Sequence, residues 1–330
     1  GTYQITGNGF QPDFSWVKNR DNAEKHLVFD SVRGNTNMTD KFLAFDAVTA
    51  EGASGVGGTT VTVNADGMQI EESTIGAGEL YFNGRTYVMW NWKANGAGSQ
   101  NTDGSINTTA TSANVDAGFS ISAYTGNATE GATVGHGLSK TPEMYIIRQR
   151  NLSGNWWTYH KDVGATHSLR LDNNSTAYDD STIFNDTAPT ADVLSIGTYS
   201  DVNRNTGTFL CYAFHSVEGY SKFSSYIGNG SADGSYVHLG FRPRFFALKR
   251  TDSADSWVIF DSAREPENED DGQDLSLKAD TTDAEAAYGN IDFLSNGVKI
   301  RITAGYMNEN NSKYIYMAFA EVPAKYSNAR

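Results

Sequence analysis

Two pairs of neighbouring carboxylates, Glu71–Glu72 and Asp179–Asp180, could do acid–base chemistry. Glycoside hydrolysis needs two carboxyl groups about 5–9.5 Å apart on either side of a cleft. Successive residues of a strand point to opposite faces, so a neighbouring pair in one strand does not supply that geometry. The sequence also contains no G-x-S-x-G, Walker or Rossmann fingerprint. We therefore predict no catalytic residues and a chain that is not an enzyme.

The histidines and the single cysteine give no sign of a metal site. None of the histidines has metal-ligand spacing such as H-E-x-x-H. His136 and His238 occupy similar positions ahead of two related segments, which favours structural hydrogen bonds over catalysis. Cys211 lies in the apolar run Phe209–Phe214, so we predict a small buried side chain and no internal disulfide. The sequence predicts no metal-binding residues.

Two acidic stretches, residues 265–274 and 201–205, supply the hard oxygen ligands that Ca²⁺ uses. Neither is an EF-hand, because Lys278 and Tyr212 stand where the bidentate Glu would follow. A solvated acidic loop is the favoured interpretation. We predict no cofactor, and Ca²⁺ remains the alternative.

Four tyrosines are the best candidates for contact with a ligand. They lie among Asp, Asn, Ser or Gly residues, in segments that vary within the chain, and such loops commonly carry binding residues. These predicted ligand-binding residues are Tyr178, Tyr199, Tyr288 and Tyr306.

A threefold internal repeat must position these residues. Pro12, Pro142 and Pro243 open similar segments, and at the same distance beyond each proline a second similar segment follows. These second segments are His-Leu-Val-Phe-Asp at 26–30, Trp-Trp-Thr-Tyr-His at 156–160 and Trp-Val-Ile-Phe-Asp at 257–261. Each copy closes with an aromatic run, at 87–92, 209–214 and 314–319. Trp156 and Trp257 could stack on sugars, but their matched positions in a predicted strand favour a core role.

Short apolar runs alternate with Gly, Asn, Asp and Ser clusters, which indicates an all-β fold of three tandem antiparallel β-sandwich-like repeat modules. Asp-Gly and Asn-Gly sequences predict β-hairpins at 63–70 and 293–300. A helical turn is expected only near 283–287. The predicted divisions are module 1 at 1–96, a Gly/Ser/Asn/Thr-rich linker or loop at 97–117, module 2 at 118–219 and module 3 at 220–330.

The charge balance excludes one class of partner. The chain has 330 residues, with 25 Lys+Arg against 39 Asp+Glu, and a formal net charge of −14. Nucleic-acid binding depends on clustered Lys and Arg, so we expect no nucleic-acid partner. The sequence contains no apolar run of about 18 residues, so we expect a chain that is not embedded in a membrane.

Several segments resemble repeat modules in tail-fibre and other virion proteins of marine tailed bacteriophages. They are residues 133–138 with 141–144, residues 84–93 and residues 29–34. The resemblance implies a β-rich adhesion domain at the distal end of an oligomeric fibre, often a trimer. The chain would then be part of the virion, extracellular and on the phage tail. Copy one lacks the Tyr-x-Gly-Asn lead found at 124–127 and 226–229, as expected of a chain cut from a longer fibre.

The function implied by this resemblance is receptor binding: non-catalytic recognition of a host surface and attachment to it. The expected partners are a bacterial cell-surface glycan or outer-membrane protein, further copies of the chain in a homo-oligomer, most simply a trimer, and other virion proteins. A structural virion protein, as fibre shaft or capsid decoration, is the first alternative. A polysaccharide depolymerase is the second.

Overall fold

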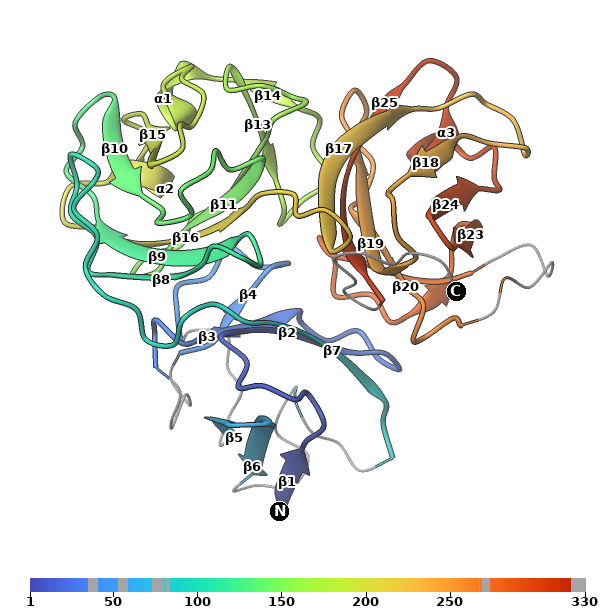
Figure 1. Ribbon diagram of the computed structural model, residues 1–330, viewed down its shortest axis with the longest axis horizontal. Helices are drawn as coiled ribbons and strands as arrows, with labels where there is room; N and C mark the ends of the chain where they lie inside the picture. The colour runs from blue at the N-terminus through green and yellow to red at the C-terminus, as the bar shows by residue number, and fades with distance from the viewer. Residues whose placement is uncertain are drawn as a thin grey trace.

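The computed structural model describes residues 1–34, 41–52, 59–72, 80, 84–266, 268 and 274–321. Nearly all of its regular elements are β-strands in antiparallel sheets, which confirms the all-β prediction. Figure 1 shows three lobes arranged around a common centre. The first lobe is blue, the second green to yellow, and the third orange to red.

The lobes follow one another along the chain. The first contains β1 (Thr2–Ile5), β2 (Phe14–Asn19), β3 (Leu27–Asp30), β4 (Leu43–Ala44), β5 (Thr59–Asn64), β6 (Gly67–Glu72) and β7 (Tyr87–Trp92). The second contains β8 (Ala110–Asn114), β9 (Phe119–Thr125), β10 (Ala132–Gly135), β11 (Met144–Gln149), β12 (Trp156–His160), β13 (His167–Arg170), β14 (Tyr178–Asp179), α1 (Ser181–Phe184), β15 (Val193–Ile196), α2 (Ser200–Asn203) and β16 (Thr208–Phe214). The third contains β17 (Ser221–Ile227), β18 (Tyr236–His238), β19 (Pro243–Arg250), β20 (Val258–Asp261), β21 (Leu275–Lys278), β22 (Ala286–Ala287), β23 (Ile291–Leu294), β24 (Gly297–Ile300), α3 (Gly305–Asn308) and β25 (Lys313–Ala320).

Each lobe has one large sheet and one small sheet. The large sheets have the orders β4-β3-β2-β7, β14-β13-β12-β11-β16-β9-β8 and β17-β25-β19-β20-β21-β22. The strand order β4-β3-β2-β7 thus recurs as β13-β12-β11-β16 and as β21-β20-β19-β25. The pairing register recurs with it, because Asp30, His160 and Asp261 face the matched residues Phe14, Met144 and Phe245. Strand order and pairing register therefore correspond among the three large sheets.

Both predicted hairpins are confirmed, as β5–β6 and β23–β24. The glycine in each follows the turn rather than forming its tip. A Cβ on Gly67 would lie 2.0 Å from the Ile5 carbonyl oxygen, and one on Gly297 would lie 2.2 Å from that of Val237. In both small sheets a third strand therefore approaches too closely for any other residue.

The structure differs from the prediction in two segments. Within the predicted linker 97–117, residues 110–114 form β8 and pair with β9. The hydroxyl-rich composition suggested a linker, but in the structure a hydroxyl of this segment forms a hydrogen bond across the sheet. Thr111 Oγ1 lies 3.1 Å from Ser122 Oγ. The helical turn expected near 283–287 is wrong, because Ala286–Ala287 form β22. The helices that the structure describes are the single turns α1, α2 and α3.

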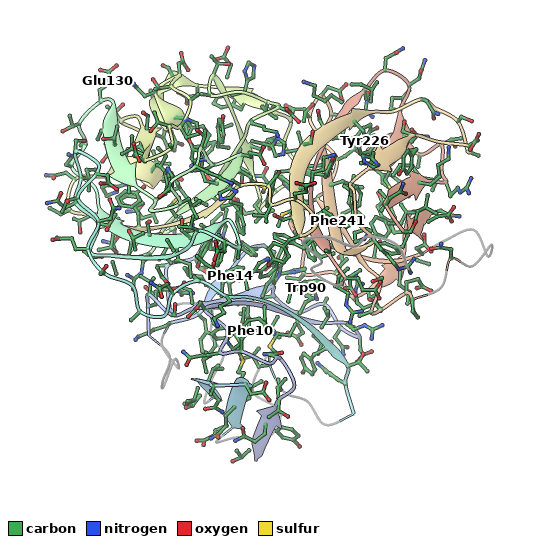
Figure 2. The ribbon with its side chains drawn as sticks, viewed as in Figure 1. Phe10, Phe14, Trp90, Glu130, Tyr226 and Phe241 are labelled. Atoms are coloured by element: carbon green, nitrogen blue, oxygen red, sulfur yellow. The ribbon has the colours of Figure 1, made fainter. Side chains whose placement is uncertain are left out.

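One face of each large sheet contributes to a single shared core at the centre. Phe14 stacks obliquely on Tyr212 at 4.7 Å, Phe45 meets Trp156 at 4.6 Å, and Trp92 meets Phe319 at 5.3 Å between ring centroids. Figure 2 shows Phe14 and Trp90 on the side of the first lobe that faces the centre. Trp156 and Trp257 are fully buried here, which confirms their predicted core role.

The shared core contains a cavity of about 20 Å³, lined by side chains of all three lobes, among them Phe14, Tyr212 and Trp257. Its lining is apolar, and water enters only cavities that offer polar partners, so we expect it to be dry. The opposite face of each large sheet packs on the small sheet of its own lobe, giving three separate outer cores.

The lobes close into a ring through equivalent contacts. In each lobe one loop reaches the neighbouring lobe, where a backbone N–H of the loop donates to a carbonyl. This loop follows β4 in the first lobe, β13 in the second and β21 in the third. These bonds run from Glu51 to Arg150 at 2.8 Å, from Ala177 to Thr251 at 2.9 Å and from Glu285 to Arg20 at 2.8 Å. The third of them joins the last lobe back to the first. The outer faces, with their small sheets and loops, are what the ring presents to solvent.

Candidate functional site

The structure groups the four predicted tyrosines into two pairs. Tyr178 on β14 and Tyr199 just before α2 belong to the second lobe, with 53% and 37% of their surface exposed. Tyr288 and Tyr306 belong to the third lobe, where they pack against its outer core. Both pairs lie where the edge of the large sheet meets the helical turn of the same lobe.

The third-lobe pair has its ring faces covered. Tyr288 and Tyr306 stack on each other, with centroids 4.1 Å apart and planes 15° from parallel. Lys278 Nζ lies 4.4 Å from the Tyr288 ring centroid. Burial raises the pKa of Tyr306 to about 12. We expect these two tyrosines to be structural, because their rings cover each other and both are partly buried.

The second-lobe pair is open to solvent. Tyr199 meets the buried ring of Trp157 edge to face at 5.3 Å, and its backbone N–H donates to the Thr182 carbonyl at 2.9 Å. The Arg170 guanidinium lies over the same Trp157 ring, 5.5 Å from its centroid. Tyr178 pairs with Ser168 across β13 and β14, which brings it beside Arg170, two residues further along β13. We call Tyr178, Tyr199, Arg170, Asp180 and Asp201, above Trp157, the tyrosine patch.

Both carboxylates of the patch are held by backbone N–H groups. Asp180 Oδ1 accepts the Thr182 N–H at 2.9 Å and so caps α1. Asp201 Oδ2 accepts the Asn155 N–H at 2.9 Å. Burial raises the pKa of Tyr199, and the negative charge of Asp201 adds to the shift. Sequence reasoning missed Arg170 and considered Asp201 only as part of an acidic stretch, because strand pairing and a tertiary contact bring these residues to the tyrosines.

The Tyr-x-Gly-Asn leads have a structural role. The Tyr124 hydroxyl donates to the Val202 carbonyl at 2.8 Å, and in the third lobe Tyr226 donates to that of Met307 at 2.7 Å. The next residue after each carbonyl is a buried asparagine, Asn203 or Asn308, whose Oδ1 accepts the N–H of the lead asparagine. The lead therefore fastens β9 to α2 in the second lobe and β17 to α3 in the third.

Buried charges cross the boundary between the first and second lobes. Arg33 Nε lies 2.6 Å from Asp30 Oδ2, and Arg33 Nη1 lies 3.4 Å from Glu51 Oε1. Arg150 of the second lobe binds the other oxygen of Glu51 at 2.7 Å. The Tyr212 hydroxyl, also of the second lobe, donates to Asp30 Oδ2 at 2.7 Å. We call this arrangement an interface ion network.

An equivalent interface ion network joins the third lobe to the first. Arg264 Nε lies 2.5 Å from Asp261 Oδ2, and Arg264 also contacts Glu285. Arg20 of the first lobe binds Glu285 at 2.7 Å. Trp90 Nε1 donates to Asp261 Oδ2 at 3.2 Å. The carboxylates in both networks are each paired with arginine, so they are organised for lobe packing rather than for proton transfer.

Among the residues that the structure describes, the boundary between the second and third lobes has no such network. The strand registers place His160 at the position that Asp30 and Asp261 occupy in the other lobes. They place Met317 at the position of Tyr212 and Trp90. The other three charged positions of the network also hold uncharged residues here. The first arginine is replaced by Val163, the glutamate by Ala177, and the arginine of the neighbouring lobe by Thr251. All the charged partners are thus replaced together, as expected because an unpaired buried charge is costly.

His160 should make stability depend on pH. Burial lowers its pKa to about 4, from the usual 6.5. Because the folded pKa lies below the unfolded one, the unfolded chain binds the proton first as the pH falls. Folding stability therefore decreases from about pH 6.5 to pH 4, by roughly 2 kcal/mol between pH 7 and pH 5. Urea unfolding at both pH values should show a smaller loss in His160→Gln; an equal loss would contradict the assignment.

The other candidate residues do not converge. Asp179 pairs with His167 in the β13–β14 ladder, whereas Asp180 caps α1. In the part of the chain that the structure describes, no group of three or more His, Cys, Asp and Glu could hold a metal ion. Most of the acidic stretch 265–274 lies outside the described residues. Cys211 is buried as predicted, and burial raises the pKa of its thiol.

Comparisons with known proteins identify a family but no function. Within the described ranges, no helix is long and apolar enough to cross a membrane. No curated protein and no solved structure matches the chain. A family model described as a domain of unknown function, DUF7483, matches residues 1–323, and the chain therefore belongs to the DUF7483 family.

Proposed function

We propose that the chain is a non-catalytic receptor-binding region of a phage tail fibre, which attaches the virion to a glycan or outer-membrane protein on a bacterial surface. The sequence resemblance to virion repeat modules suggests this role. The observation that carries the proposal is the tyrosine patch, whose two aromatic side chains are exposed, whereas the inner faces of the large sheets are packed together. A rigid body that displays loop aromatics is suited to surface recognition.

Binding at single sites of this kind is weak, and linked copies would add avidity. We propose a homotrimer, as in many fibres, with other virion proteins as further partners and the phage tail as the location. The internal ring already uses the inner faces of the lobes, so contacts between copies would involve other surfaces. Light scattering tests this, because the chain has a mass of 35.9 kDa and a trimer would have three times that mass.

Cell binding tests the function. The fluorescently labelled chain should bind saturably to cells of a susceptible strain, bind no resistant strain, and reduce phage adsorption when added in excess. A fibre-shaft or capsid-decoration protein would bind no cells and leave adsorption unchanged. A depolymerase would shorten polysaccharide extracted from the host, which size-exclusion chromatography would detect. Either result would overturn the proposal.

A further inference from the structure

We propose that the tyrosine patch of the second lobe binds a neutral saccharide, an inference that rests on the proposed function and names its ligand class. The patch combines exposed aromatic area with fixed polar groups. Among the exposed large hydrophobic side chains in the described ranges, Tyr178 has the largest exposed fraction, 53%. The apolar C–H face of a pyranose ring can stack on such a ring, while its hydroxyls need hydrogen-bonding partners nearby.

The polar partners are present and already oriented. Backbone N–H groups of Thr182 and Asn155 hold the carboxylates of Asp180 and Asp201, which can accept hydrogen bonds from sugar hydroxyls. Arg170 stacks on Trp157 and donates to Ser175 Oγ at 3.1 Å, and the part of the chain that the structure describes contains no carboxylate in ion-pair contact with it. Its remaining N–H groups can donate to a hydroxyl oxygen. Side chains held in place before binding lose little entropy on binding.

The charges at the patch select against acidic sugars. Two carboxylates, Asp180 and Asp201, act with a single cation, Arg170, on the electrostatics of Tyr199, in a chain whose net charge is −14. A uronate or sulfated sugar would meet net repulsion, whereas a neutral sugar would use the same carboxylates as hydrogen-bond acceptors. The patch therefore fits a neutral hexose or N-acetylhexosamine.

The equivalent place in the third lobe is closed, so the third lobe offers no second copy of the site. The register that pairs Ser168 with Tyr178 pairs Ser276 with Ala286, so a small side chain replaces Tyr178 there. The same correspondence places Tyr288 at the position of Asp180. The Tyr288 ring stacks on Tyr306. The third lobe thus fills with its own aromatic rings the space that the second lobe leaves open.

Saturation-transfer NMR and calorimetry on the full chain test this inference, with maltotetraose, cellotetraose and chitotetraose as neutral probes and tetragalacturonate as the acidic probe. At least one neutral probe should bind saturably at millimolar concentration, and tetragalacturonate should not. Tyr178→Ala should weaken that binding roughly tenfold or more, and Tyr178→Phe should retain it. The matched control is Tyr236→Ala, another exposed tyrosine at 44%, which should change nothing.

The inference is overturned if no neutral probe binds, if tetragalacturonate binds more tightly, or if Tyr178→Ala binds as well as the unaltered chain. Unfolding curves of each variant check that the fold is retained. The two proposals fail separately. If the chain attaches to cells and Tyr178→Ala attaches equally, the site is wrong and the function stands. If the chain binds a neutral probe but no cells, the site stands and host attachment is wrong.

Discussion

Trp156→Ala is expected to lower the free energy of unfolding of the whole chain by about 3–5 kcal/mol. The Trp156 side chain is fully buried in the shared core, where it meets Phe45 of the first lobe edge to face at 4.6 Å. Its Nε1 donates to the Ala44 carbonyl of the first lobe at 2.7 Å. The substitution removes both contacts and leaves a cavity where two lobes meet. Trp156→Phe keeps most of the packing and loses only the donor, which should cost about 1–3 kcal/mol.

The shared core should also make the effect spread over all three lobes. Hydrogen exchange followed by mass spectrometry should show Trp156→Ala increasing exchange in peptides from every lobe, with a single transition in calorimetry. Ile196→Ala is the matched control, because Ile196 is fully buried in the outer core of the second lobe. That variant should increase exchange in the second lobe alone. Separate transitions for separate lobes would show that the central core does not couple them.

The sequence predicted the strands well where local pattern determines them. The hairpin β5–β6 follows from alternation around a Gly turn, and the matched burial of Trp156 and Trp257 follows from the repeat. Single-turn helices such as α1 are too short to show a helical period, so they were missed. β8 was missed because its hydroxyl-rich sequence has the composition of a linker.

The ring arrangement could not be predicted, because it depends on contacts between distant segments. Buried cations illustrate this point. Lysine side chains are mostly exposed in proteins, but Lys18 in β2 is buried. Its Nζ donates to the carbonyls of Asn19 at 2.9 Å and of Thr282 in the third lobe at 3.1 Å. At the matched position of the third lobe, burial lowers the pKa of Lys249 to about 8. The Thr282 carbonyl comes from another lobe, so the sequence around Lys18 does not reveal this acceptor.

The sequence predicted only part of the candidate site, again because the rest depends on contacts between distant segments. Tyr178 and Tyr199 stand out in sequence because they are aromatic residues among polar ones. Tyr288 stands out equally, but in the structure its ring stacks on a neighbour. Sequence alone does not distinguish an exposed ring from a stacked one, because the difference lies in which residue packs against it. Arg170 became part of the patch only through the register of β13 and β14.

Asp261→Asn should lower the free energy of unfolding by about 3 kcal/mol. The amide oxygen still accepts the backbone N–H groups of Ala263 and Arg264, so the local turn is kept. The amide nitrogen at the Oδ2 position accepts neither from Arg264 Nε nor from Trp90 Nε1, so these two hydrogen bonds are lost with the charge. Arg264 is then a buried cation with one carboxylate partner, Glu285, instead of two. Urea unfolding near neutral pH measures the change. Asp233→Asn is the control: Asp233 also pairs with a cation but is 81% exposed, so its loss should have no measurable effect.

A double variant separates the cost of an unpaired charge from the value of the interface ion network. Arg264→Met alone leaves Asp261 without its cation and should also be strongly destabilising. Combined with Asp261→Asn, it removes both charges, and the loss should be smaller than the sum of the single losses by about 2 kcal/mol. The boundary between the second and third lobes supports this, because His160, Val163 and Met317 occupy the matched positions there without ion pairs. Additive losses would mean that the two side chains act independently and that the lobes do not depend on their pairing.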